Sequence, residues 1–397
     1  MKTQTQPQAP SVITAKEWAA LSPKERSEWR AILPRHERLP VWCMVCYGIA
    51  ALALIIYLVA RLSPAFADFF NQNVSELFRR TLAFFTSPIP FSVGEALILL
   101  LPVGFGLTVW YAAKYRCDTW RSTWSFVGIL LAVLSLILSM FVFTFATGYH
   151  GRTLDQKLGL DQKEVSAEEL YQTALILAEK VNEEHANTVY GADGFSVMPY
   201  SLSDMNDKLL DAYDGFCAEH AFIDHYDTRL KPVMLSELMN YTHITGVYSY
   251  FTGEANIDVA FPDYTIPYTA AHELAHQRGI AREDEANMVA FLVCMQSDDA
   301  YIRYCAYLNM YEYVANALYR ANPDLYSQVR ATLNADVRSE MVAYSAFFSK
   351  YQNSTASSVS GAVNDTFLKF QGTEGTASYG MVVDLTVAYY KQLGLVQ

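Results

Sequence analysis

Three long apolar segments in the first 150 residues constrain the fold of this chain more than any other feature. They cover residues 41–60, roughly 93–112, and 124–147. Each is close to the ~20 residues that a helix needs to cross a hydrocarbon layer about 30 Å thick. The only charged residue within them, Glu95, lies near one end of the second segment. We therefore predict three transmembrane helices, because runs so free of charge are hard to bury in a soluble protein.

The charge of the chain divides at the end of the third segment. Up to Thr147, 13 Lys and Arg stand against 8 Asp and Glu, whereas residues 148–397 have 16 against 33. The acidic part lacks the clustered basic residues that phosphate binding requires. This balance argues against nucleic acid as a partner.

Basic residues also predict the orientation in the membrane. They are frequent in the first forty residues and in the short loop before the third segment, and cytoplasmic loops carry such an excess. We expect a cytoplasmic N-terminal arm (1–40), a membrane domain (41–147) and an extracytoplasmic domain (148–397) of a cell-membrane protein. Residues 64–85 have apolar side chains at helical spacing, which favours a helix along the bilayer surface.

The outer domain is predicted to be mainly α with a small sheet, an α+β arrangement. Ser166 and Glu169 form a capping-box pattern, and apolar residues follow at helical spacing up to about residue 190. Short segments rich in aromatic and β-branched residues between 232 and 259 predict strands. Most of the chain beyond them has a helical pattern. Cys294 and Cys305 can pair if the second helix folds back on the first.

The segment from His272 to His276 has the sequence His-Glu-Leu-Ala-His. Histidines four residues apart share one face of a helix, so both imidazoles can reach one metal ion. Glu273 is then placed to act as general base toward a water molecule. Ordinary helical histidines are the alternative interpretation. The predicted strand ahead of the helix, and the small residues beside the histidines, favour a zinc hydrolase site with one Zn²⁺.

A catalytic zinc site has a third protein ligand, and two glutamates compete for this role. Gly279 is expected to end the motif helix, and an acidic segment then begins a second helix. A hairpin centred near residue 281 brings Glu285 level with His276, so geometry favours Glu285 as the ligand. Glu283 remains the rival.

Further polar residues are candidates for supporting roles. If Glu283 is the ligand, Asn287 shares its helical face and can brace a ligand histidine. A developing oxyanion needs a hydrogen-bond donor. The candidates for this role are His220, His225, His243, Tyr248 and Tyr250. Ordinary packing is the alternative for each of them.

Several segments together resemble a known family. They are Phe-Thr-Gly-Glu-Ala-Asn (251–256), His-Glu-Leu-Ala-His-Gln-Arg-Gly (272–279), Glu-Asp-Glu-Ala-Asn (283–287), Arg-Tyr (303–304), Val-Asn-Asp (363–365) and Ser-Tyr-Gly (378–380). With these the chain resembles the DUF3810 family of bacterial membrane proteins, which look related to the gluzincin zinc metallopeptidases. The resemblance implies a membrane-anchored, zincin-like metallopeptidase domain with zinc, and it names no substrate. Tyr248–Tyr250 departs from the proline-containing stretch expected there.

These patterns lead to two hypotheses about function. The first is a membrane-anchored zinc metallopeptidase that hydrolyses a peptide or protein, with the lipid bilayer as its other partner. Residues 250–257 are then expected to form an edge strand that binds an extended peptide. The substrate-side candidates are Tyr250, Glu254, Asn256, His243, Tyr304 and Tyr379. A structural role is the alternative for Glu254 and Asn256, and core packing is the alternative for Tyr304 and Tyr379. The second hypothesis is a non-enzymatic membrane sensor or assembly factor with a metallopeptidase-like ligand-binding domain.

Overall fold

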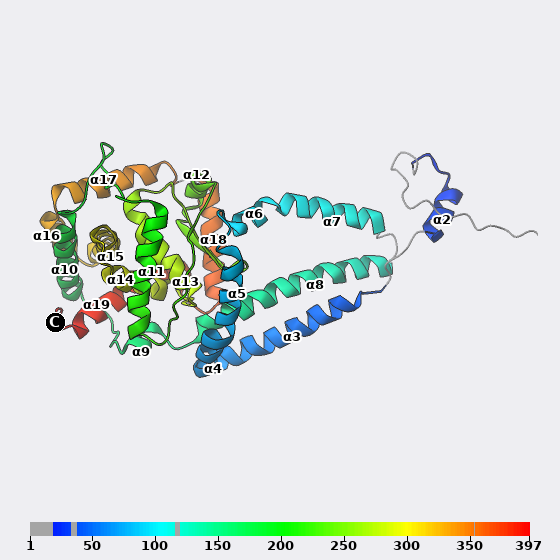
Figure 1. Cartoon of the computed structure of the whole chain (residues 1–397), viewed down its shortest axis with the longest axis horizontal. Coiled ribbons are helices and arrows are strands. Elements are labelled where there is room, and N and C mark those ends of the chain that lie inside the picture. Colours follow the sequence, from blue (N-terminus) through cyan, green and yellow to red (C-terminus); the bar gives the residue numbers. More distant parts are fainter. Residues whose placement is uncertain (1–18, 33–37, 116–119, 353) are drawn as a thin grey trace, which may run out of the picture. The chain divides into compact units, whose positions relative to one another are not determined.

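The computed structural model describes residues 19–32, 38–115, 120–352 and 354–397. It divides into two compact units. One unit contains the residues up to 49 together with 100–136, and the other contains 50–99 and 137–397 (Figure 1). The second unit therefore begins well before residue 148, where the charge balance predicts the domain boundary. Part of the predicted N-terminal arm lies outside the described residues, and α2 (Pro23–Ile32) is the helix within it.

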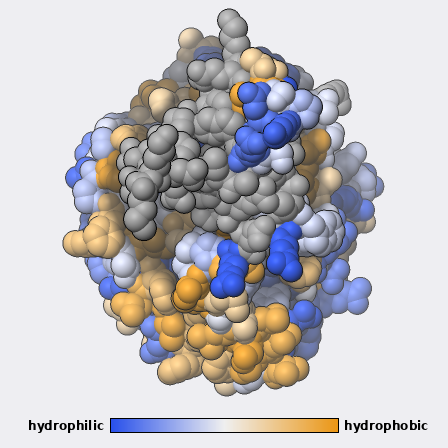
Figure 2. Space-filling view, turned by 90° about the vertical axis from the view of Figure 1, so that its right-hand side faces the viewer, coloured by the Kyte–Doolittle hydropathy of each residue, from blue (hydrophilic) through white to orange (hydrophobic). Residues whose placement is uncertain are grey.

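Two helices in the described residues are long and apolar enough to cross a membrane. They are α3 (Val41–Leu62) and α8 (Trp120–Thr144), with mean hydropathies of 2.5 and 2.8. In the first unit they meet through Cys43, Cys46 and Ala132, and the Tyr47 hydroxyl donates to the Gly128 carbonyl at 2.6 Å. Most of their large apolar side chains are exposed, and apolar side chains gather in a broad area in the lower part of Figure 2. The first and third predicted spans are confirmed as helices of this kind.

The second predicted span is broken into two helices. α6 (Val93–Leu99) and α7 (Leu101–Tyr115) bend by 46° at the break between them, so they form one span only if the pair is taken together. Pro102 explains the break, because proline has no backbone N–H and its ring collides with the carbonyl four residues earlier in a continuous helix. The single helix predicted over roughly 93–112 is therefore two helices, and the second crossing of the membrane stays a prediction.

The second unit is mainly helical (Figure 1). Its helices before the sheet are α4 (Pro64–Phe69), the π-helix η1 (Phe70–Ser75), α5 (Glu76–Thr86), η2 (Ala146–His150), α9 (Leu154–Leu158), α10 (Ala167–His185) and α11 (Leu202–Glu219). The later helices are α12 (Ser236–Met239), η3 (Asn240–Thr242), η4 (Asp263–Thr265), α13 (Ile266–Gln277), α14 (Glu283–Met295), α15 (Ala300–Ala321), α16 (Pro323–Thr332), α17 (Ala335–Ser349), α18 (Thr355–Phe370), η5 (Gly375–Met381) and α19 (Val382–Gln392). The predicted capping box is present, since Ser166 and Glu169 exchange side-chain and backbone hydrogen bonds at the start of α10.

One three-stranded sheet occurs in the described residues. Its order is β1 (Lys231–Pro232), β3 (Glu254–Ile257), β2 (Gly246–Ser249), with β1 parallel and β2 antiparallel to β3. All four residues of β3 are buried, as expected for a central strand. The predicted edge strand at 250–257 is therefore wrong, because β3 has a partner on each side and β2 lies at the edge.

The motif helix α13 is surrounded by the core of this unit. Every one of its residues except Thr269 is buried. It packs against α14, β3 and β2, and its small residues Ala271 and Ala275 are fully buried. A helix enclosed in this way carries its polar side chains into the protein interior, where each needs a partner. Cys294 and Cys305 on the neighbouring helices α14 and α15 are buried free thiols, so they do not form the disulfide considered from the sequence.

Candidate metal centre

Two histidines of α13 converge on the first residue of α14. The Nε2 atoms of His272 and His276 each lie 3.2 Å from Oε2 of Glu283. One ligand atom from each of the three residues lies within 4.8 Å of the other two. In a tetrahedral site with bonds of about 2.0–2.1 Å, neighbouring ligand atoms are about 3.3 Å apart. The separations between the histidine nitrogens and the carboxylate oxygen therefore fit a shared divalent cation such as zinc.

The orientation of His276 is fixed by a backbone carbonyl. Its Nδ1 lies 2.7 Å from the Ile280 oxygen, which can only accept a hydrogen bond. Nδ1 therefore carries the proton, and in the neutral ring the lone pair of Nε2 is free for a metal. Nδ1 of His272 is buried and has no hydrogen-bond partner within the described parts of the chain.

The carboxylate of Glu283 and the imidazole of His276 stabilise each other's charged forms. Burial alone would lower the pKa of His276, but the Glu283 carboxylate outweighs it and raises this pKa to about 9. Burial alone would raise the pKa of Glu283, and the two histidines reverse this and hold the pKa of the carboxyl well below its usual range. The carboxylate is thus the ionised form, as a metal ligand must be.

Glu273 lies beside the edge strand β2. Its side chain is only 4% exposed, and Oε2 has no hydrogen-bond partner within the described residues. Burial raises the pKa of Glu273, while His272 and His276 oppose that shift. Gly246 leaves the room for this carboxylate, because a Cβ there would lie 2.6 Å from Oε1. A raised pKa and an unpaired oxygen are suited to a group that accepts a proton.

Glu285, which the sequence favoured as the third metal ligand, does not face the two histidines. Its Oε1 accepts a hydrogen bond from the Leu154 N–H at 3.0 Å and lies 3.8 Å from Nε of Arg282. Burial raises the pKa of Glu285 to about 7. α14 begins at Glu283 itself, and residues two apart on a helix point about 200° away from each other. Only one of the two glutamates can face α13, and the structure corrects the preference to Glu283.

Asn287 does not brace a histidine. Its carbonyl accepts a hydrogen bond from the Tyr268 hydroxyl at 2.9 Å, and its side-chain Nδ2 is buried with no partner among the described residues. The group that orients His276 is instead the Ile280 carbonyl. The sequence could not predict this role, because every residue has a backbone carbonyl whatever its side chain is.

Glu254 and Asn256 have structural roles on β3. The Glu254 carboxylate accepts hydrogen bonds from the Val93 and Gly94 N–H groups, at 3.1 and 2.9 Å, at the start of α6. The Asn256 amide donates to the Val247 carbonyl across the sheet at 3.0 Å. Both side chains are buried. The structure therefore attaches them to the fold and does not support the substrate-side roles predicted for them.

The remaining substrate-side candidates are dispersed. Nε2 of His243 lies 2.9 Å from the Tyr351 carbonyl oxygen, and its ring is tilted against that of Phe348, with 4.5 Å between the ring centroids. Tyr304 is fully buried and donates to Glu340. The side chain of Tyr379 lies outside the described part of the structure.

Tyr250 is the substrate-side candidate nearest to the histidines. Its ring stacks on Phe145 with 6.2 Å between ring centroids, and Phe145 meets the ring of His276 at 5.8 Å. The ring of Phe141, on α8, also contacts Tyr250, with 4.7 Å between the two ring centroids. These rings form an aromatic wall beside the metal centre, built partly from the end of the third apolar segment. Among the other candidate donors, His220 packs against Phe216 and His225 pairs with Asp214.

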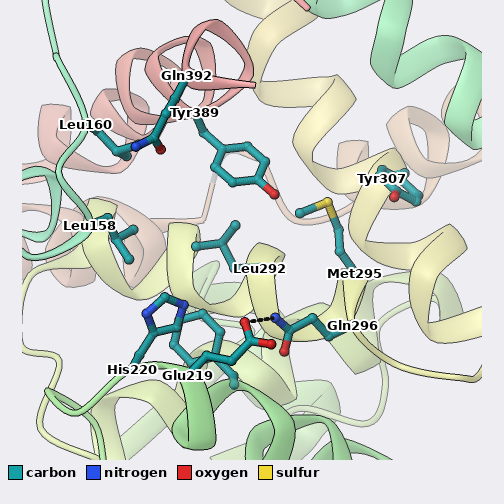
Figure 3. A pocket seen from close by; sticks show the side chains of 11 residues that line it. Leu158, Leu160, Glu219, His220, Leu292, Met295, Gln296, Tyr307, Tyr389 and Gln392 are labelled. Carbon is teal, nitrogen blue, oxygen red and sulfur yellow. Dashed lines mark hydrogen bonds between the residues drawn. The ribbon is translucent and has the colours of Figure 1, made fainter. Parts of the chain in front are cut away.

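A separate cavity of about 420 Å³ opens at the other end of α14 (Figure 3). Its lining is Leu158, Leu160, Phe216, Glu219, His220, Leu292, Met295, Gln296, Tyr307, Tyr389 and Gln392. None of the three histidine and glutamate ligand candidates belongs to it. At 1.5 Å per residue, Leu292 lies about 14 Å along the helix from Glu283, so the cavity and the metal centre are distinct.

Comparison with known proteins gives one finding. No curated protein and no solved structure matches the chain. The family described as "Protein of unknown function (DUF3810)" matches residues 70–387, about four-fifths of the sequence. That match includes the helices from η1 onward and the cluster of His272, His276 and Glu283. The chain belongs to the DUF3810 family.

Proposed function

We propose that this protein is a membrane-anchored, zinc-dependent metallopeptidase with a zincin-like domain. One observation carries the proposal: a single oxygen of Glu283 lies 3.2 Å from Nε2 of both His272 and His276. Two imidazoles and one carboxylate are a common ligand set of catalytic zinc, which leaves a position open for water or substrate. The adjacent Glu273 supplies a buried carboxylate with an unpaired oxygen.

The chemistry would be hydrolysis of a peptide bond. A zinc ion held by His272, His276 and Glu283 supplies Lewis acidity that polarises a carbonyl and makes water a nucleophile near neutral pH. Glu273 acts as general base and then passes the proton to the leaving amine. Its raised pKa favours this role, since a carboxylate with a raised pKa accepts a proton from water more readily than an ordinary carboxylate does.

The edge strand β2 is the best candidate for binding the substrate. Gly246 of β2 contacts the Glu273 side chain, and a backbone hydrogen bond of Tyr248 also acts on the carboxylate. Within the described residues β2 pairs with β3 alone. An extended peptide that adds to the other edge of β2 would run past Glu273. This assignment replaces the one made for residues 250–257.

The contacts of α5 support three crossings of the bilayer. Nη1 of Arg79 donates to the Thr144 carbonyl at 2.9 Å, and Ser75 meets Thr147 at 3.4 Å, so the segment after α3 packs against the segment after α8. Both segments must lie on the same side of the membrane. If α3 and α8 each cross once, the chain between them must also cross once, which makes the broken pair α6–α7 the second span. The basic N-terminal region then favours an extracytoplasmic metal centre.

A pair of variants of the full-length protein tests the proposal. His272→Ala removes a ligand and should lose bound zinc, whereas Glu273→Gln should keep zinc and lose peptidase activity by two or more orders of magnitude. Zinc is measured by atomic absorption, and activity with a peptide library. A wild-type protein that binds no zinc would refute the proposal.

The enclosure of the site favours the second candidate function, a non-enzymatic sensor. His272 is 9% exposed and His276 6%, and the cavity of Figure 3 does not reach them. In that case Glu283 and the two histidines serve as a buried ion-pair cluster or a structural metal site. Cells that carry the Glu273→Gln protein distinguish the two functions, because a sensor would remain fully functional in them.

A further inference from the structure

The turn between the two metal-ligand helices is held by residues some 200 positions earlier in the chain. Nδ2 of Asn71, on the π-helix η1, donates to the Gly279 carbonyl at 2.9 Å. Gly279 has φ +92°, and a Cβ there would lie 2.4 Å from Nη2 of Arg79 on α5. The space beside the turn is therefore filled by the Arg79 guanidinium and the Asn71 amide.

Arg79 is buried at the centre of this contact. It is 1% exposed and donates to Oδ1 and the backbone oxygen of Asn71, at 2.9 and 3.0 Å, and to the Thr144 carbonyl. No carboxylate in the described residues forms an ion pair with it. Burying a charge without an ionic partner is costly. The Thr144 carbonyl offsets part of this cost, because it ends the 25-residue helix α8, where the helix dipole is negative.

The hydrogen bonds continue from Arg79 to a metal-ligand histidine. Arg79 donates a hydrogen bond to the Asn71 side chain, and Asn71 donates to the Gly279 carbonyl. The next carbonyl in the chain, that of Ile280, accepts the Nδ1–H of His276. The two carbonyls lie in adjacent peptide planes that meet at the Cα of Ile280, so once the first plane is held, only the φ and ψ of Ile280 set the direction of the second carbonyl. The π-helix widens the turn that carries Asn71, and such turns are frequent at functional sites.

We propose that Asn71 and Arg79 are positioning residues of the metal centre: they set the Ile280 carbonyl and thereby the tautomer and direction of His276. The inference rests on the proposed function, since it concerns a divalent cation at His272, His276 and Glu283. It adds that the centre is completed by helices between the first and second apolar segments. Residues 148–397 alone lack both positioning residues.

The test compares two variants in the full-length, detergent-purified protein. Asn71→Ala removes the donor to Gly279. Ser75→Ala is the matched control, because it removes a buried hydroxyl contact from the same π-helix without touching the turn. Zinc affinity is measured by chelator competition, and ligand geometry by the absorption spectrum of the Co²⁺ form. Melting temperatures of the metal-free proteins report the purely structural effect.

Asn71→Ala should weaken zinc binding 10- to 100-fold, the usual range for partners of ligand histidines, and should alter the Co²⁺ spectrum. Ser75→Ala should lower the melting temperature without either change. Arg79→Met should resemble Asn71→Ala, and Arg79→Lys, which keeps a donor, should restore part of the affinity. Equal zinc affinity and spectra in wild type and Asn71→Ala would overturn the inference while leaving the metallopeptidase proposal intact. A wild type without zinc affinity would overturn both.

Discussion

At the scale of single residues, Gly246 determines whether Glu273 can take its position. The carboxylate occupies the space that any side chain at 246 would fill. We predict that Gly246→Ala displaces Glu273, destabilises the protein by about 1–3 kcal/mol and lowers peptidase activity, since added volume in a packed interior forces side chains to move. Zinc content should stay unchanged because the ligands lie on α13 and α14.

The matched control for this change is Gly361→Ala on α18, where a new Cβ meets no atom within 4 Å. It should be neutral or slightly stabilising, as alanine is in a helix. Activity and zinc content of the two variants are compared under the same conditions. Full activity in Gly246→Ala would contradict the assignment of Glu273 as a closely packed base.

A second residue-scale prediction concerns pH. Burial, with the nearby Glu340, raises the pKa of Glu312 to about 8. Because the pKa of this carboxyl is higher in the folded than in the unfolded protein, the carboxyl contributes stability that is fully present below about pH 4.5. This contribution is lost as the pH rises through about 8. The amide of Glu312→Gln does not titrate. The free energy of unfolding of this variant, relative to that of the wild type, should therefore rise between pH 5 and pH 8.5, by a few kcal/mol at most. Urea unfolding at the two pH values measures this, with the exposed Glu237→Gln as a control that shows no such trend.

The metal centre shows what residue patterns can and cannot predict. The spacing of His272 and His276 predicted that both imidazoles lie on one face of α13, because helical periodicity is local. The acidic residue that joins them depended on where α14 begins, and the structure places Glu283 there instead of Glu285. Asn71 and Arg79 could not be found at all, since their role depends on a tertiary contact across some 200 residues.

At the scale of elements, α5 has two faces with different environments. Leu77, Phe78, Phe84 and Phe85 are exposed on one side, while Arg79 and Ala83 are buried on the opposite side. At about 100° per residue these sets are centred roughly half a turn apart. An exposed aromatic face on a helix that follows a membrane span fits the lipid interface, as the pattern of residues 64–85 indicated.

We predict that a nitroxide label at position 85 of the reconstituted protein is more accessible to oxygen, which concentrates in lipid, than to a polar nickel complex. A label at Tyr319, an exposed aromatic position on α15, serves as the control and should favour the nickel complex. Continuous-wave EPR power saturation gives both accessibilities. Equal behaviour of the two labels would exclude a lipid-facing α5.

Elements were predictable where their signal was local. The capping box of α10 and the glycine that ends the motif helix came from short patterns, and Gly279 indeed has a positive φ. The order of the sheet did not follow from the sequence, because pairing partners of short strands are set by tertiary contacts. The break at Pro102 could have been anticipated from the cost of proline within a helix.

At the scale of the whole molecule, topology is the property most open to test. In a background without the six native cysteines, single cysteines at Asn73 and Glu164 should react with a membrane-impermeant maleimide from the same side. A cysteine at Lys114, at the end of α7, should react only from the opposite side. Reaction of all three positions from one side would show that the pair α6–α7 does not cross, and would refute three spans.

The buried contact of Arg79 and Asn71 with Gly279 also bears on how the protein matures. Synthesis proceeds from the N-terminus, and domains generally fold in that order. Both side chains therefore leave the ribosome, and their helices reach the bilayer, before the hairpin that will bear the ligands has been made. The hairpin of α13 and α14 then packs onto helices that were made before it, so under the proposed function metal binding would depend on correct membrane insertion of those helices.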